Sequence, residues 1–377
     1  MRLALCFSLG MLVLPGAASG ASLLFNGLET GSPLDEPIAE FAEYEVWRHR
    51  EVSIDLNALY ETAEPAAPDP SIRLNLFDDA VYQARFLDLD SVPDVGAEVW
   101  TGIVEGRMGP GTAVFVVDGE GRILGNVRVD GELFHFLYDE QTGDHHLVQL
   151  NPDFRLGGVP DCLGPRPATD DGFTVFAMPA EAAPLAAGGE ETHTITVKIV
   201  HDAVISGGWF FGLQAAAAVH EANTMLAIQG NRARFEIGGL LPSDYIASGN
   251  MKDVDLPWLT TSSYATTNRG TADLVVLVVA SGDACGYGFI GDGQARKDSR
   301  FTSVVRRDCM VTNLTLPHEL GHNLSACHDR YIGDCPSGFD GDRHGFIVTW
   351  TELGSCPWYK PDGFLQGNPR RPERACI

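Results

Sequence analysis

The sequence predicts an α+β protein made of two units, and three observations lead to this fold class. Short apolar or alternating runs separated by tight turns fill residues 22–180, which is typical of strands joined by hairpins. Residues 181–191 follow, lack periodicity and are rich in Ala, Gly and Pro, as expected for an exposed linker. From residue 192 onward, strand-like runs alternate with helical stretches. We therefore expect a strand-rich first unit and an α/β or α+β second unit.

In the first unit, the clearest strands are expected at Ala113–Val117 and Phe134–Tyr138, where apolar side chains follow one another or alternate. In the second unit, a strand is expected at Thr194–Val200, and an alanine-rich helix at Leu213–Gln229 ends before a Gly-Asn pair. We also expect strands at Arg234–Ile237 and Ala272–Val279, the latter apolar enough to be covered on both faces.

Composition limits the classes of function. The chain has 377 residues, of which 44% are hydrophobic and 20% charged, so it can bury two or three cores. Asp and Glu total 51 against 26 for Lys and Arg, which gives a net charge of -25. Nucleic-acid phosphates and anionic lipids would repel such a chain. We therefore expect neither a nucleic-acid partner nor a membrane partner.

Residues 1–21 are typical of an export signal. Arg2 precedes an apolar run from Leu3 to Leu14, and small residues follow as a cleavage site. The run is shorter than the roughly 20 residues that cross a bilayer. We expect a secreted protein, either extracellular or periplasmic in a Gram-negative cell.

The cysteines fall into two groups once the signal is removed. Six lie between residues 285 and 376, and an even number in one region of an exported protein predicts three disulfides. The pairing stays open, because six cysteines allow 15 connectivities. Cys162 stands alone upstream, either as an incidental buried thiol or as a thiolate ligand for a metal.

The segment from Leu316 to Asp329 carries histidines at metal-ligand spacing. His318 and His322 are four residues apart on a predicted helix, so both imidazoles can reach one ion. His328 can join them if the chain turns sharply after the helix. Three histidines leave the fourth position to water, as in catalytic zinc sites.

Glu319 follows the first of these histidines and can lie beside the ion without binding it. Zinc lowers the pKa of a bound water toward about 7, and an adjacent carboxylate can take the proton. The segment therefore predicts a hydrolase with Zn²⁺ as its cofactor and Glu319 as its catalytic residue.

The run His318–Asp329 resembles the metzincin metallopeptidase signature His-Glu-x-x-His-x-x-Gly-x-x-His-Asp, most closely in the adamalysin or reprolysin-like branch and its bacterial relatives. The order of elements over residues 192–329 is also similar. The resemblance implies a metzincin-like α/β catalytic domain over residues 192–377, with a mixed sheet and a zinc-binding active-site helix. It implies endopeptidase activity on protein or peptide substrates. The zinc ligands implied are His318, His322 and His328, with Glu319 as general base and acid.

The same resemblance implies that Cys285–Phe289 lies at the edge strand that binds an extended substrate. Two positions depart from the family pattern. Ser325 replaces the glycine of the turn, at a cost on the order of 1 kcal/mol. No methionine follows Met310, although metzincins carry a methionine turn beneath the metal, and residues 346–353 stand in its place.

Two alternatives follow from this divergent or truncated C-terminus. One is a secreted zinc-binding protein that is impaired in catalysis. The other is a metalloprotease in which Glu352 replaces His328 as the third ligand.

A signal, a strand-rich unit and a linker ahead of a hydrolase together predict a zymogen. Residues 22–180 would form a propeptide domain that covers the cleft until the linker, residues 181–191, is cut. Related zymogens use a cysteine of the pro-segment as an inhibitory metal ligand, and Cys162 is the candidate for that role here. We expect the protein to be a monomer.

Overall fold

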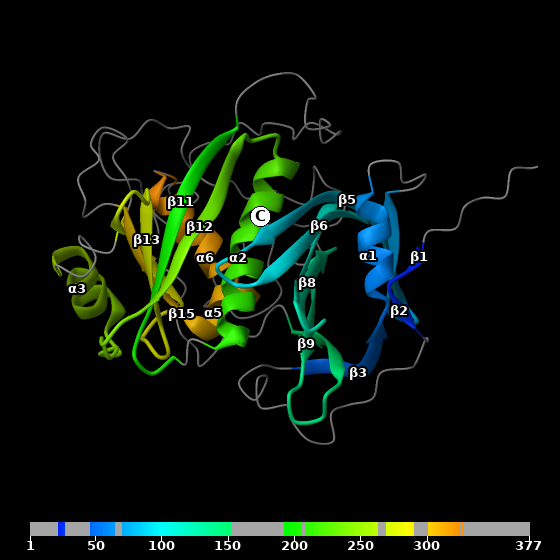
Figure 1. The fold of residues 1–377 in the computed structure, drawn as a ribbon, viewed down its shortest axis with the longest axis horizontal. Coiled ribbons are helices and arrows are strands. Elements are labelled where there is room, and N and C mark those ends of the chain that lie inside the picture. The colour runs from blue at the N-terminus through cyan, green and yellow to red at the C-terminus, as the bar shows by residue number, and fades with distance from the viewer. Residues whose placement is uncertain are drawn as a thin grey trace, which may run out of the picture.

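The computed structural model describes residues 22–26, 46–64, 70–151, 192–205, 208–262, 269–289, 301–324 and 326. They form two units that pack side by side (Figure 1). The predicted signal, the linker, Cys162, His328 and the segment that includes Glu352 lie outside the described residues.

The first unit is a ten-stranded sheet with one helix, α1 (Leu56–Ala63). Its strand order is β1-β4-β5-β6-β7-β8-β9-β10-β3-β2. The strands are β1 (Ser22–Leu23), β2 (Phe25–Asn26), β3 (Val46–Ile54), β4 (Ser71–Phe77), β5 (Ala80–Val92), β6 (Ala97–Gly106), β7 (Gly109–Asp118), β8 (Ile123–Val129), β9 (Glu132–Tyr138) and β10 (His145–Leu150). Because β1 pairs with β4 and β2 pairs with β3, the short segment 22–26 joins both ends of the sheet. The sheet therefore curls around one core (Figure 1).

Aromatic side chains fill that core. Trp100, Phe115, Phe134 and Phe136 are buried; the Phe115 ring contacts those of Trp100 and Phe136, and the Phe134 ring contacts that of Phe77. Trp100 Nε1 donates a hydrogen bond to Thr62 Oγ1 in α1 at 3.0 Å, which ties the helix to the sheet. The two strands expected in this unit lie within β7 and β9.

The second unit is a five-stranded sheet with helices on both faces. Its strand order is β12-β11-β13-β15-β14, and only β14 runs antiparallel to its neighbour, so the sheet is mixed. The strands are β11 (His193–His201), β12 (Ala233–Pro242), β13 (Leu274–Val279), β14 (Gly286–Gly288) and β15 (Thr302–Arg306). The helices are α2 (Trp209–Ile228), η3 (Met251–Asp255), α3 (Leu256–Thr261), α5 (Arg307–Thr312) and α6 (Thr315–Asn323).

Strand β13 is buried on both faces, as its apolar run predicts. Successive side chains point to opposite sides of a strand. Leu274, Val276 and Val278 accordingly pack with α2, whereas Val275 and Leu277 pack with the residues of α3. The α+β fold class predicted from the sequence is confirmed.

Two element boundaries of the second unit differ from the expected ones by more than two residues. Helix α2 begins at Trp209 rather than at Leu213. The sequence does not reveal this start, because the N-cap residue, Gly208, has no side chain that could accept a capping hydrogen bond. Strand β12 continues to Pro242 through two glycines, where a register shift against β11 keeps the strands paired.

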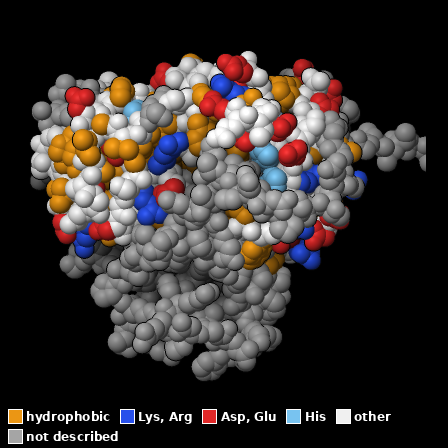
Figure 2. Space-filling view, turned by 90° about the horizontal axis from the view of Figure 1, so that it is seen from below, with side chains coloured by type: hydrophobic (Ala, Val, Ile, Leu, Met, Phe, Trp, Pro, Cys, Tyr) orange, Lys and Arg blue, Asp and Glu red, His pale blue; other side chains and the backbone are white. Residues whose placement is uncertain are grey.

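On the face drawn in Figure 2, acidic and basic side chains of the described residues are interspersed with polar and apolar ones. Among the helices described, none has the length and apolar character needed to cross a membrane.

Candidate metal centre

Helix α6 carries three of the predicted site residues. It starts after Leu314, which has a left-handed backbone conformation (φ 57°), and His318 N donates to the Leu314 carbonyl at 3.0 Å. This conformation costs a non-glycine residue on the order of 1 kcal/mol. Only Asn313 and Leu314 separate α6 from the preceding helix, α5.

His318 and His322 come together on one side of α6. Their ring centroids lie 4.5 Å apart and the ring planes are inclined at 81°. Two imidazoles at this separation can bind the same ion, which is the geometry that their spacing of four residues predicts.

His322 is oriented for metal binding by a backbone contact. Its Nδ1 lies 2.8 Å from the Ala326 carbonyl oxygen, and a donated hydrogen bond there leaves Nε2 as the ligating nitrogen. Burial lowers the pKa of His322, against the opposing effect of the Ala326 carbonyl. The lowered pKa favours the neutral ring, which is the protonation state that a metal ligand needs.

The side chain of Glu319 points from α6 toward the edge strand, β14, and is fully buried. A Cβ atom at Gly286 would lie 2.7 Å from Glu319 Oε1, and one at Gly288 would lie 2.7 Å from Oε2. The carboxylate therefore fills the space that side chains at these two positions would take. Nothing in the local sequence indicates this role of the two glycines.

The end of α6 is also fastened to the sheet. Asn323 Nδ2 donates to the carbonyls of Phe289 at 3.0 Å and Thr302 at 3.1 Å, so one amide joins α6 to the segment after β14 and to β15. A disulfide between Cys285 and Cys309 ties the start of β14 to α5. The other four cysteines of the expected group lie outside the described residues.

The described residues fit a metal ion only in part. They contain no group of three or more His, Cys, Asp or Glu side chains placed to hold one. Two neighbouring imidazoles, one of them held by a carbonyl, and the buried carboxylate of the residue after His318 correspond to two ligands and the base of the predicted site. The third ligand, His328, stays a prediction.

Comparisons with known proteins include this segment. Residues 213–329 match the sequence profile of the family described as "Metallo-peptidase family M12B Reprolysin-like". A "Peptidyl-Asp metalloendopeptidase" of Stenotrophomonas maltophilia (strain R551-3) is 24% identical over 340 residues, which is 81% of this chain and 78% of the relative. A protein of the same name from Xanthomonas campestris pv. campestris is 23% identical over 401 residues, 97% of this chain and 93% of the relative.

Among solved structures, the crystal structure of metalloproteinase-II from Bacteroides fragilis aligns with a TM-score of 0.43 and 13% identity. The alignment covers 68% of this chain and 81% of that protein.

Proposed function

We propose that this chain, a metalloendopeptidase of the reprolysin-like M12B family, is a zinc enzyme secreted as a zymogen. The observation that carries the zinc assignment is the pair His318 and His322, whose rings share one side of α6 next to the buried Glu319. His328 completes the proposed ligand set. Protein substrates follow from the family.

His322 and Glu319 of α6 have different tasks in this proposal. A zinc ion, when bound, supplies Lewis-acid chemistry that polarises the peptide carbonyl and acidifies water. His322 holds its ring in one orientation through the Ala326 carbonyl. Glu319 is excluded from solvent between α6 and β14, where its carboxylate can take a proton from water and pass it to the leaving amine.

The proposed zymogen consists of residues 22–180 as propeptide, the linker 181–191 and a catalytic unit from residue 192. Cys162 is the proposed inhibitory ligand, because a thiolate in the fourth zinc position would displace the water. Premature activity of an uncut Cys162→Ser chain would support this latch, and unchanged latency would contradict it.

The proposed function is tested by incubating the linker-cut protein with a broad mixture of unstructured peptides and identifying the cuts by mass spectrometry. We expect cleavage at internal bonds that a chelator stops and that added zinc restores. Chelator-insensitive cleavage would contradict the zinc assignment. The residues flanking each cut also show whether the aspartate in the relatives' name describes this chain's preference.

Gly288→Ala is expected to slow catalysis and leave the metal in place. Its Cβ would lie 2.7 Å from Glu319 Oε2 and 3.2 Å from the Glu319 carbonyl oxygen, so the carboxylate has to move. We expect kcat to fall on the order of 10- to 100-fold, because misplacing a catalytic group by about 1 Å has effects of that size. Steady-state kinetics and zinc titration measure both quantities.

The control for this variant is Gly119→Ala, since a Cβ at Gly119, an exposed turn position, meets nothing within 4 Å. Equal kcat values for the two variants would show that the glycine at 288 does not position Glu319.

A further inference from the structure

Helix α2 is shared between the two units. The helix lies between the two units (Figure 1), and most of its residues are buried, in an almost continuous run from Phe211 to Thr224. A helix that is apolar all round is buried by neighbours on several sides. One core cluster accordingly joins α2 to the first unit, which contributes Val92, Ala97, Val99, Val114, Val116 and Leu124. Removing the first unit would expose this apolar face of α2 to water.

The contact between the units is close in its apolar part. A Cβ atom at Gly212 of α2 would lie 3.0 Å from Val95 Cγ1, in the turn between β5 and β6. This distance is shorter than ordinary contact, so the glycine allows the turn to approach the helix. The two surfaces are therefore fitted to each other.

A buried ion pair lies within the same contact. Arg128 Nε of β8 donates to Glu221 Oε1 of α2 at 2.5 Å, and Asn126 Nδ2 donates to Glu221 Oε2 at 3.1 Å. Glu221 is almost fully buried. Without the first unit, its carboxylate would lose these partners.

Arg128 also reaches the turn ahead of the metal-binding helix. Its guanidinium donates to the carbonyls of Val311 and Thr312, each at 2.7 Å. These carbonyls end α5 and precede Leu314, whose left-handed conformation starts α6. Carbonyls at a helix end need donors, and here the donors come from the first unit.

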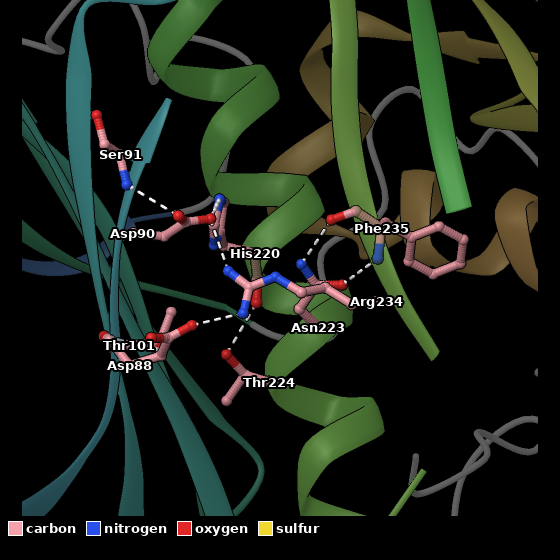
Figure 3. Close-up of polar contacts among 9 residues, drawn as sticks. All are labelled: Asp88, Asp90, Ser91, Thr101, His220, Asn223, Thr224, Arg234 and Phe235. Carbon is pink, nitrogen blue, oxygen red and sulfur yellow. Dashed lines mark hydrogen bonds and ion pairs between the residues drawn. The ribbon is translucent and has the colours of Figure 1, made fainter. Parts of the chain in front are cut away.

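A second ionic contact links the units on another side of α2 (Figure 3). Arg234 of β12 pairs with Asp88 and Asp90 of β5, each at 2.6 Å, and His220 of α2 lies 3.7 Å from Asp90. Figure 3 shows these side chains pointing toward one another across the gap between β5 and α2. The Arg128–Glu221 pair and the contacts of Arg234 are both ionic. They therefore fix how the two units align across a contact that is otherwise apolar.

We propose that the sheet of residues 46–151 is a permanent second subunit of the enzyme, which stays bound to the catalytic unit after the linker is cut. Arg128 is then a positioning residue that holds the turn before α6. The inference uses the proposed linker cleavage, but the association itself does not depend on zinc or activity.

The test uses the full chain with a recognition sequence for a specific protease inserted at residues 181–191. After complete cutting, sedimentation velocity at micromolar concentration and about 0.15 M salt is expected to show one particle that contains both fragments. Two separately sedimenting fragments would overturn the proposal. Because no activity is measured, this outcome would leave the zinc peptidase assignment standing.

Arg128→Ala tests the contribution of the ion pair. In the cut chain we expect the dissociation constant of the two fragments to rise by roughly 100-fold, because one partner of a buried pair is removed. Hydrogen exchange of residues 307–324 is expected to accelerate in the uncut variant. Arg107→Ala is the matched control, since the Arg107 side chain is 89% exposed and pairs only at 3.5 Å with Asp130.

Circular dichroism of the uncut Arg128→Ala chain shows whether this variant folds. If the variant does not fold, Glu221→Gln, which keeps the shape of the side chain, takes its place in the same measurements. Weaker association than in Arg107→Ala supports the positioning role. Equal association and equal exchange in the two arginine variants would overturn it.

Discussion

Glu319→Gln is expected to lower kcat/KM for peptide cleavage on the order of 1,000-fold, because the amide cannot accept the proton that the carboxylate takes. Zinc affinity should stay within about twofold, since Glu319 is not a proposed ligand. Glutamine has almost the same shape, so the packing against Gly286 and Gly288 is kept. Kinetics with a fluorogenic peptide and zinc titration of the same preparations provide the two readouts.

The matched control is Glu236→Gln, because Glu236 lies on β12 with an exposed side chain. Activity of Glu319→Gln equal to that of the control would remove Glu319 from catalysis. A loss of zinc together with activity would instead make Glu319 a ligand, which contradicts its assigned task.

Glu221→Ala is expected to destabilise the intact chain by about 3 kcal/mol or more. The substitution leaves Arg128 and Asn126 facing α2 without the carboxylate that accepts their hydrogen bonds. Removing one member of a buried ion pair has effects of this size. Urea unfolding followed by circular dichroism and by tryptophan fluorescence measures the change, and coincident transitions indicate that both units unfold together.

Glu236→Ala, on the exposed side of β12, is expected to change the unfolding free energy by less than about 0.5 kcal/mol. If Glu221→Ala were no more destabilising than Glu236→Ala, the contact between the units would not depend on the buried pair.

Helix α6 and its pair of histidines could be predicted from the sequence because their signal is local. His318, Glu319 and His322 lie within one turn and a half of helix, so their spacing alone fixes which side chains share a face. The mixed sheet followed from the family resemblance and from the apolar run of β13.

The contact between the units could not be predicted, because its residues are far apart in the chain. Arg128 and Glu221 are separated by 93 residues, and Arg128 and Val311 by 183. No periodicity in either segment indicates the other. The role of Gly288 was also hidden, since only the folded chain brings β14 to within contact distance of Glu319.

The most direct test of three imidazoles on one ion is zinc-edge X-ray absorption of the purified chain, combined with zinc titration of single alanine variants. We predict one zinc per chain with three imidazole ligands, and at least 100-fold weaker binding, about 2.7 kcal/mol, in His318→Ala, His322→Ala and His328→Ala. His193→Ala, at an exposed position, and Glu352→Ala should bind zinc like the unaltered chain. Unchanged affinity in His328→Ala, with loss in Glu352→Ala, would contradict the assignment.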